Sequence, residues 1–76
     1  MIFLIQYDRK KGNLVSFRSF DESDRRVAED ERLELELRLN QEGTKDEVVL
    51  LEAASENALR QTHRRYFETL RQLSQP

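Results

Sequence analysis

The chain of 76 residues lacks cysteine and contains one histidine, and these two scarcities exclude most kinds of metal and redox site. Without thiols it can form no disulfide, thiolate metal site or cysteine nucleophile. The single histidine, His63, belongs to no nucleophile motif, and there is no second histidine that could bind a metal together with it. We therefore expect a structural role for His63. We therefore predict a protein that is not an enzyme and that holds no metal and no cofactor.

Glycine is also scarce. Gly12 and Gly43 are the only two, and neither belongs to a phosphate-binding loop such as G-x-x-x-x-G-K-[ST]. The apolar run at the amino terminus ends at Gln6 and follows no basic leader, which makes it too short for a signal peptide or a membrane span. We expect a cytoplasmic protein that does not enter a membrane.

The length fits a single domain, which we place at residues 1–74 with a frayed tail at 75–76. A domain this small buries only about 60% of the surface of its unfolded chain, and association with another subunit is one way to gain stability. The net charge of −2 is unevenly spread: residues 1–20 carry +3, residues 21–47 carry −6 and residues 55–76 carry +2. This layout favours an acidic helix beside basic neighbours and provides no dominant basic field for nucleic acid.

The first predicted strand carries the strongest signal in the sequence. Residues 1–5 are apolar at every position, and because a strand points alternate side chains to opposite faces, both faces should be covered. A turn at residues 10–12, Lys-Lys-Gly, then predicts a hairpin in which Arg9 pairs with Asn13. This register places the odd-numbered residues of the first strand on one face and the even-numbered residues on the other.

Residues 21–42 are dominated by helix formers, begin with capping side chains and end before Gly43, which favours a helix stop there. An alternation of leucine with charged residues inside this stretch would also suit a strand, with 32–40 pairing with 47–54 in a four-stranded sheet. We favour one continuous helix over 23–41, because the alternating part contains no β-branched and no aromatic residue.

The predicted helix has two apolar sides. A helical period places Ala28, Leu35 and Leu39 on one stripe, and Leu33 and Leu37 nearly opposite. One set should pack on the sheet, and the other should face outward. Like the first strand, this helix indicates that a further surface covers part of the domain.

A third strand over 47–54 is again apolar on both faces, and Ser55 caps a last helix that we expect to run to about Leu73. The order strand, strand, helix, strand, helix predicts an α+β domain. Because crossover connections are right-handed, the simplest sheet has the order 2-1-3, with the first strand central and antiparallel to both neighbours. We place both helices on one face of this sheet.

With both helices on one face, the opposite face would be an open apolar patch. Its residues would be Ile2, Leu4, Leu14, Val48 and Leu50. Such a patch costs solubility, and a two-fold dimer can bury it against itself. We therefore predict a small protein-interaction module that forms a homodimer, or binds another protein, through this face. Leu33 and Leu37 on the first helix form the rival contact surface.

Arginines on the last helix suggest an alternative function. Arg60, Arg64 and Arg71 line one stripe close to Phe67, and guanidinium groups bind phosphates and carboxylates. The alternative is therefore binding of nucleic acid or of another anionic ligand. Because the sequence has no basic groove with interleaved aromatic residues, we favour the structural interpretation, in which these arginines pair with acidic residues of the first helix.

Overall fold

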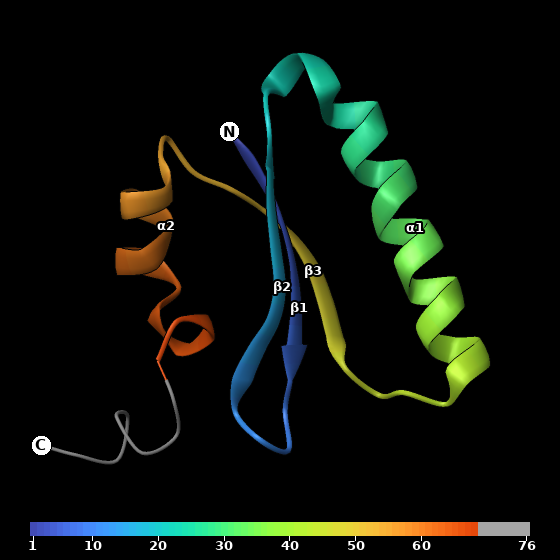
Figure 1. Cartoon of the computed structure of the whole chain (residues 1–76). Helices are drawn as coiled ribbons and strands as arrows, with labels where there is room; N and C mark the ends of the chain where they lie inside the picture. Colours follow the sequence, from blue (N-terminus) through green and yellow to red (C-terminus); the bar gives the residue numbers. More distant parts are fainter. Residues whose placement is uncertain (69–76) are drawn as a thin grey trace, which may run out of the picture.

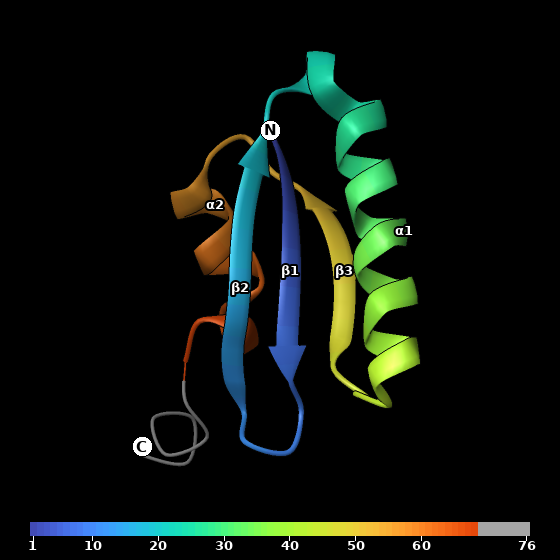
Figure 2. The ribbon, with the colours of Figure 1, turned by 45° about the vertical axis from the view of Figure 1, so that its right-hand side comes forward.

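The computed structural model describes residues 1–68 and contains a three-stranded antiparallel sheet with one helix on each side (Figure 1). The strands are β1 (Ile2–Asp8), β2 (Asn13–Phe20) and β3 (Glu47–Glu52), in the order β2-β1-β3 (Figure 2). The helices are α1 (Arg25–Glu42) and α2 (Glu56–Thr62), with short 3-10 turns at Glu22–Asp24 and Arg64–Tyr66. The predicted α+β class and the predicted strand order are confirmed.

The central strand β1 is buried on both sides from Ile2 to Tyr7. It runs antiparallel to both neighbours, with Ile5 opposite Phe17 of β2 and opposite Val49 of β3. Its odd-numbered side chains pack towards α2, and its even-numbered side chains pack towards α1. The chain thus covers both faces of its most apolar strand by itself.

Each face of the sheet has its own core. We call the first the α2-side cluster; its buried residues are Phe3, Ile5, Tyr7, Leu59 and Tyr66. We call the second the α1-side cluster; its buried residues are Ile2, Leu4, Phe20 and Ala28. The prediction that both helices lie on one face is therefore wrong, because α1 and α2 contribute to different clusters.

The connections explain why the helices separate. A helix that joins two parallel strands is restricted to a right-handed crossover, which fixes the side of the sheet on which α1 lies. In contrast, α2 follows β3 and leads to no further strand in the described part of the chain, so handedness leaves its side open. Burial of apolar side chains then determines the side on which α2 packs, since only a helix on the second face can cover Phe3 and Ile5.

The hairpin loop is longer than the predicted three residues. Asn13 pairs with Asp8 rather than with Arg9. The Asp8 carboxylate accepts hydrogen bonds from the backbone N–H groups of residues 10–11, at 2.9 and 3.1 Å, and its carbonyl accepts one from Gly12 at 2.8 Å. Gly12 has a φ of 68°, which glycine adopts without strain.

A bulge in β2 follows from this change of register. Leu14 lies opposite Tyr7, while Ser16 lies opposite Gln6 as predicted, so Val15 is the extra residue on the bulged strand. Val15 is exposed, and Leu14 packs against the α2-side cluster instead of joining the even-numbered face.

Helix α1 is continuous over 18 residues, so the four-stranded alternative is wrong. It ends at Gly43, whose φ of 73° is the left-handed conformation typical of a helix stop. Its buried residues are those that the periodicity predicts, Ala28, Leu35 and Leu39. Leu33 and Leu37 face solvent on the other side of the helix.

Helix α2 begins where the sequence predicts and ends early. The Ser55 hydroxyl accepts a backbone hydrogen bond at 3.1 Å and caps the helix. The helix stops after Thr62, because His63 adopts a φ of −125° and a ψ of 51° and the chain then makes a 3-10 turn. The predicted unbroken helix is wrong at this point; its expected end at Leu73, and the frayed tail, lie outside the described residues.

Candidate functional site

The residues of the predicted interface do not form a surface. Ile2 and Leu4 are 1% and 4% exposed beneath α1, and Val48 and Leu50 pack against the same cluster. Leu14 lies on the opposite side of the sheet, against the α2-side cluster. The face on which the predicted dimer depends is thus occupied by α1 of the same chain, and a contact through it would require α1 to move away.

The rival surface, in contrast, is open. Leu33 and Leu37 are 53% and 54% exposed, and their spacing of four residues places them side by side along α1. Two further exposed residues share this side of the helix. We call the four together the outer face of α1: Arg26, Asp30, Leu33 and Leu37. The exposed carboxylates of Glu34 and Glu36 flank the two leucines, and Glu36 also forms an ion pair with Arg32 at 3.9 Å.

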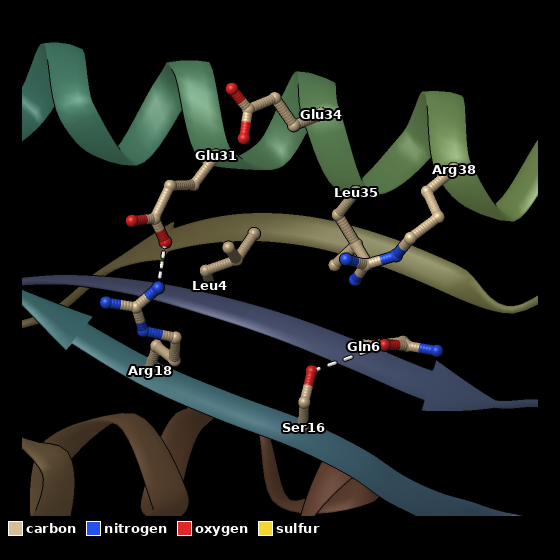
Figure 3. Close-up of a pocket in the computed structure, with 8 residues that line it drawn as sticks. All are labelled: Leu4, Gln6, Ser16, Arg18, Glu31, Glu34, Leu35 and Arg38. Atoms are coloured by element: carbon tan, nitrogen blue, oxygen red, sulfur yellow. Dashed lines mark hydrogen bonds and ion pairs between the residues drawn. The ribbon is translucent and has the colours of Figure 1, made fainter.

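A cleft of about 380 Å³ opens between α1 and the sheet, as Figure 3 shows. It exists because α1 packs mainly over β1 and β3 and leaves the part of β2 before Phe20 uncovered on this side. Leu4 and Leu35 form its apolar part. The remaining lining is polar and of mixed charge: Gln6, Ser16, Arg18, Glu31, Glu34 and Arg38.

The polar groups of this cleft largely satisfy one another. Arg18 forms an ion pair with Glu31 across the cleft (Figure 3). The buried Gln6 donates to Asp46 at 2.8 Å and accepts from the Ser16 hydroxyl at 3.3 Å. With two arginines against two glutamates the cleft has no net charge, which gives it no preference for an ion of either sign.

A second polar cluster surrounds Glu47 at the start of β3. Its carboxylate accepts hydrogen bonds from Arg9 at 2.8 and 3.1 Å, from Arg65 at 2.7 Å and from the Tyr66 hydroxyl. The Arg65 guanidinium also stacks on the Tyr66 ring at 4.2 Å, and Tyr66 meets Tyr7 edge to face at 5.2 Å. The cluster thereby joins the hairpin, β3 and the 3-10 turn after α2.

The electrostatics of this cluster indicate a structural role. Burial tends to raise the pKa of the Glu47 carboxyl, but hydrogen bonds from Tyr66 and Arg9 and the positive charges of Arg65 and Arg9 outweigh it and hold the pKa below its ordinary value. Burial and the hydrogen bond donated to Glu47 raise the pKa of the Tyr66 hydroxyl. The ionised carboxylate is fully engaged by three side chains, so it is neither a free base nor a free ligand.

Sequence reasoning missed this cluster. Its members, Arg9, Glu47 and Arg65, are far apart in the chain, and no spacing connects them. The one available signal is a glutamate directly before the apolar run Val48–Leu51, since a partly buried charge requires partners.

The predicted anion-binding arginines are occupied within the chain. Arg60 pairs with Glu56 at 3.2 Å and stacks on the Phe67 ring at 4.4 Å. Arg64 pairs with Glu68 at 2.9 Å. Both lie beside a shallow hollow next to Phe67, as the predicted stripe requires. Their carboxylate partners lie four residues away in the chain, so the expected pairing with acidic residues of the first helix is wrong for these two arginines. Arg71 lies outside the described residues, and anion binding stays a prediction.

The remaining candidates offer no centre for chemistry. The His63 ring is half buried, with its centroid 6.4 Å from that of Tyr66. Within residues 1–68 no group of three or more histidine, aspartate or glutamate side chains is arranged to hold a metal ion. The structure thus gives most support to surfaces that could contact another macromolecule.

Comparisons with protein-family models, with curated proteins and with solved structures give no match to this chain. Over residues 1–68, neither helix is sufficiently long and apolar to cross a membrane. The fold and its surfaces define a small α+β domain whose helix α1 exposes two leucines on the side away from the sheet, and function has to be inferred from these surfaces.

Proposed function

We propose that this chain is a protein-interaction domain that binds a partner through the outer face of α1. The observation that carries the proposal is the exposure of more than half of both Leu33 and Leu37 on a helix whose opposite side is firmly packed. A rigid helix that presents side chains at i and i+4 can dock in an apolar groove with little loss of conformational entropy. The proposal includes the cytoplasmic location expected from the sequence.

The chemistry around the two leucines describes the partner. Glu34 and Glu36 flank them, and Asp30 lies one turn earlier on the same side. Charges at the rim of an interface mainly select the partner and accelerate the encounter. We therefore expect an apolar groove with a basic rim on the partner protein.

A second copy of the chain fits this face poorly. If two α1 helices pack antiparallel with Leu33 against Leu37, helical geometry brings Glu34 close to Glu34 of the copy, and Glu36 close to Glu36. If they pack parallel, Asp30 lies against Asp30 of the copy within the contact stripe. Both arrangements oppose like charges, so the proposal names a different protein as the partner at this face.

The test compares a variant altered at the centre of the outer face of α1 with a control altered at its edge. Leu33→Gln/Leu37→Gln removes the apolar pair and keeps the helix propensity, whereas the control Val27→Gln removes a similarly exposed apolar residue at the edge of the face. After cross-linking in cells, we expect one protein to be captured by the wild type and by the Val27 control but not by the double variant. Thermal unfolding verifies that each variant is folded. If all three chains capture the same proteins, the outer face of α1 is not the binding surface.

A further inference from the structure

The two edges of the sheet differ in how they are protected against pairing with another strand. β3 has six residues and a glutamate at each end; Glu47 pairs with Arg9 and Arg65, and Glu52 pairs with Arg25. β2 has eight residues and pairs with no second strand within residues 1–68; α1 packs mainly over β1 and β3 and covers only the Phe20 end of β2. A long edge strand without such cover is a template for pairing with another chain.

The side chains of β2 offer little protection. Its one charged residue, Arg18, turns towards α1 and pairs with Glu31. The bulge at Val15, which bends a strand away from a partner, lies near its beginning and leaves Ser16 to Phe20 regularly paired with β1. Between these two features, Phe17 stacks on Phe3 with 5.5 Å between ring centroids and meets Phe67 edge to face at 5.6 Å, and it is partly buried at the sheet edge.

We propose that β2 pairs antiparallel with β2 of a second copy, about a two-fold axis at Phe17. In this register Phe17 lies opposite Phe17 of the copy, on the α2 side, and extends the stack with Phe3 into the other chain. Aromatic cross-strand pairs of this kind stabilise antiparallel sheets. A two-fold axis needs only one surface that is complementary to itself, and the two sheets then join through Ser16 to Arg18 of each β2, between the two bulges.

The register also keeps the positive charges of the two β2 strands apart. Arg18 lies opposite Ser16 of the copy, so the two Arg18 side chains never face each other, and each keeps Glu31 as its partner. Because the cleft beside α1 opens towards β2, the clefts of the two chains meet across the new junction and form one groove between the two α1 helices. The outer face of α1 remains free, so this inference does not depend on the proposed function.

The experiment uses the full chain, whose mass is 9.1 kDa, and measures its molar mass by sedimentation equilibrium over a range of micromolar concentrations. We expect a dimer. Ser16→Glu places a carboxylate opposite Arg18 of the copy and should tighten the dimer, whereas Ser16→Lys places like charges there and should weaken it. Each pair occurs twice in a two-fold dimer, so we expect Kd to change by roughly threefold to tenfold, in opposite directions.

Matched controls separate this register from a general effect of charge. Asn40→Glu and Asn40→Lys make the same changes on the exposed side of α1, away from β2, and should leave Kd unchanged. Circular dichroism verifies that all four variants are folded. A wild-type chain that stays monomeric, or a dimer whose Kd responds equally to both Ser16 variants, would overturn the proposal.

Discussion

The two faces of the sheet are covered in different ways. On one face a helix of 18 residues packs through a stripe of three apolar side chains, and the cluster beneath it is mostly aliphatic, with Phe20 as its aromatic member. On the other face a helix of seven residues is supplemented by aromatic rings and by the Glu47 cluster. The long helix is thus held mainly by periodic burial, with ion pairs from Arg25 and Glu31 to the sheet, whereas the short helix relies more on aromatic and hydrogen-bonded contacts.

The difference also determines where the surface stays open. On the α2 side Phe17 of β2 is packed between Phe3 and Phe67, so the aromatic layer reaches the edge of the sheet. On the α1 side the helix stops short of β2, and a polar cleft takes its place. Both proposed contact surfaces, the outer face of α1 and the edge at β2, border this less completely covered side.

The largest change in stability is expected when the buried leucine of the shorter helix is truncated. Leu59→Ala should lower the free energy of unfolding by about 2–5 kcal/mol, because Leu59 is 0% exposed and links α2 to the sheet. Urea unfolding measures the change. The control Leu33→Ala, on the exposed side of α1, should stay within about 0.5 kcal/mol of the wild type. A loss at Leu59 as small as that of the control would mean that α2 does not cover this face.

The longer helix can be tested by overpacking instead. Ala28 is fully buried where α1 approaches the sheet, so Ala28→Leu should cost about 1–3 kcal/mol through displacement of the helix. The neighbouring substitution Glu29→Leu places an apolar side chain of the same size on the exposed side and should cost little. Denaturant unfolding of both variants measures the difference, and equal stabilities would contradict the close packing of α1.

The Glu47 cluster should contribute less than the apolar anchors. Glu47→Gln keeps the shape of the side chain and removes its charge, so Arg9 and Arg65 lose an ionic partner; we expect a loss of about 1–2 kcal/mol. The control is Glu34→Gln, which makes the same change at an exposed position where no ion pair engages the carboxylate within the described residues. Chemical unfolding of both variants measures the loss. A neutral result for Glu47→Gln would show that aromatic packing alone holds the 3-10 turn.

The same cluster predicts a dependence of stability on pH. The folded chain holds the pKa of Glu47 below its ordinary value of about 4.5, so its contribution is present above that pH and is lost as the pH falls through the lower, folded value. The wild type and Glu47→Gln should therefore differ most at neutral pH and converge in acid. Thermal unfolding across the acid range checks this, and a constant difference would contradict the assigned cause.

The smallest effects are expected at the arginines beside Phe67. Arg64→Ala removes a single exposed ion pair one turn apart and should change stability by less than about 0.5 kcal/mol. Arg60→Ala also removes the stacking contact with Phe67 and should cost slightly more, about 0.5–1 kcal/mol. Thermal unfolding of the two variants side by side tests whether the contact with the aromatic ring contributes more to stability than the ion pair does.

Local chemistry was sufficient to predict the elements of this fold. Gly43 marks the end of α1 because it can adopt the left-handed conformation, and Ser55 marks the start of α2 because its hydroxyl can cap a helix. The period of the leucines correctly assigned Leu35 and Leu39 to the core and Leu33 and Leu37 to the surface.

The register of the hairpin was predicted only in part. The predicted register, in which Arg9 pairs with Asn13, implies the pairing of Ile5 with Phe17 that the structure contains. It could not identify the bulge at Val15, because that bulge depends on how the Asp8 carboxylate closes the loop. One residue was enough to move Leu14 to the other face and to remove it from the predicted interface.

The sequence by itself determined the order and identity of the elements, the strand order of the sheet and the demand of β1 for cover on both faces, because propensity, capping and periodicity act over a few residues. Only the tertiary structure decided which face each helix covers and which distant charges meet at Glu47. Both features depend on contacts between residues that are far apart in the chain. Burial of apolar surface provides most of the free energy of such contacts, and no local sequence pattern predicts them.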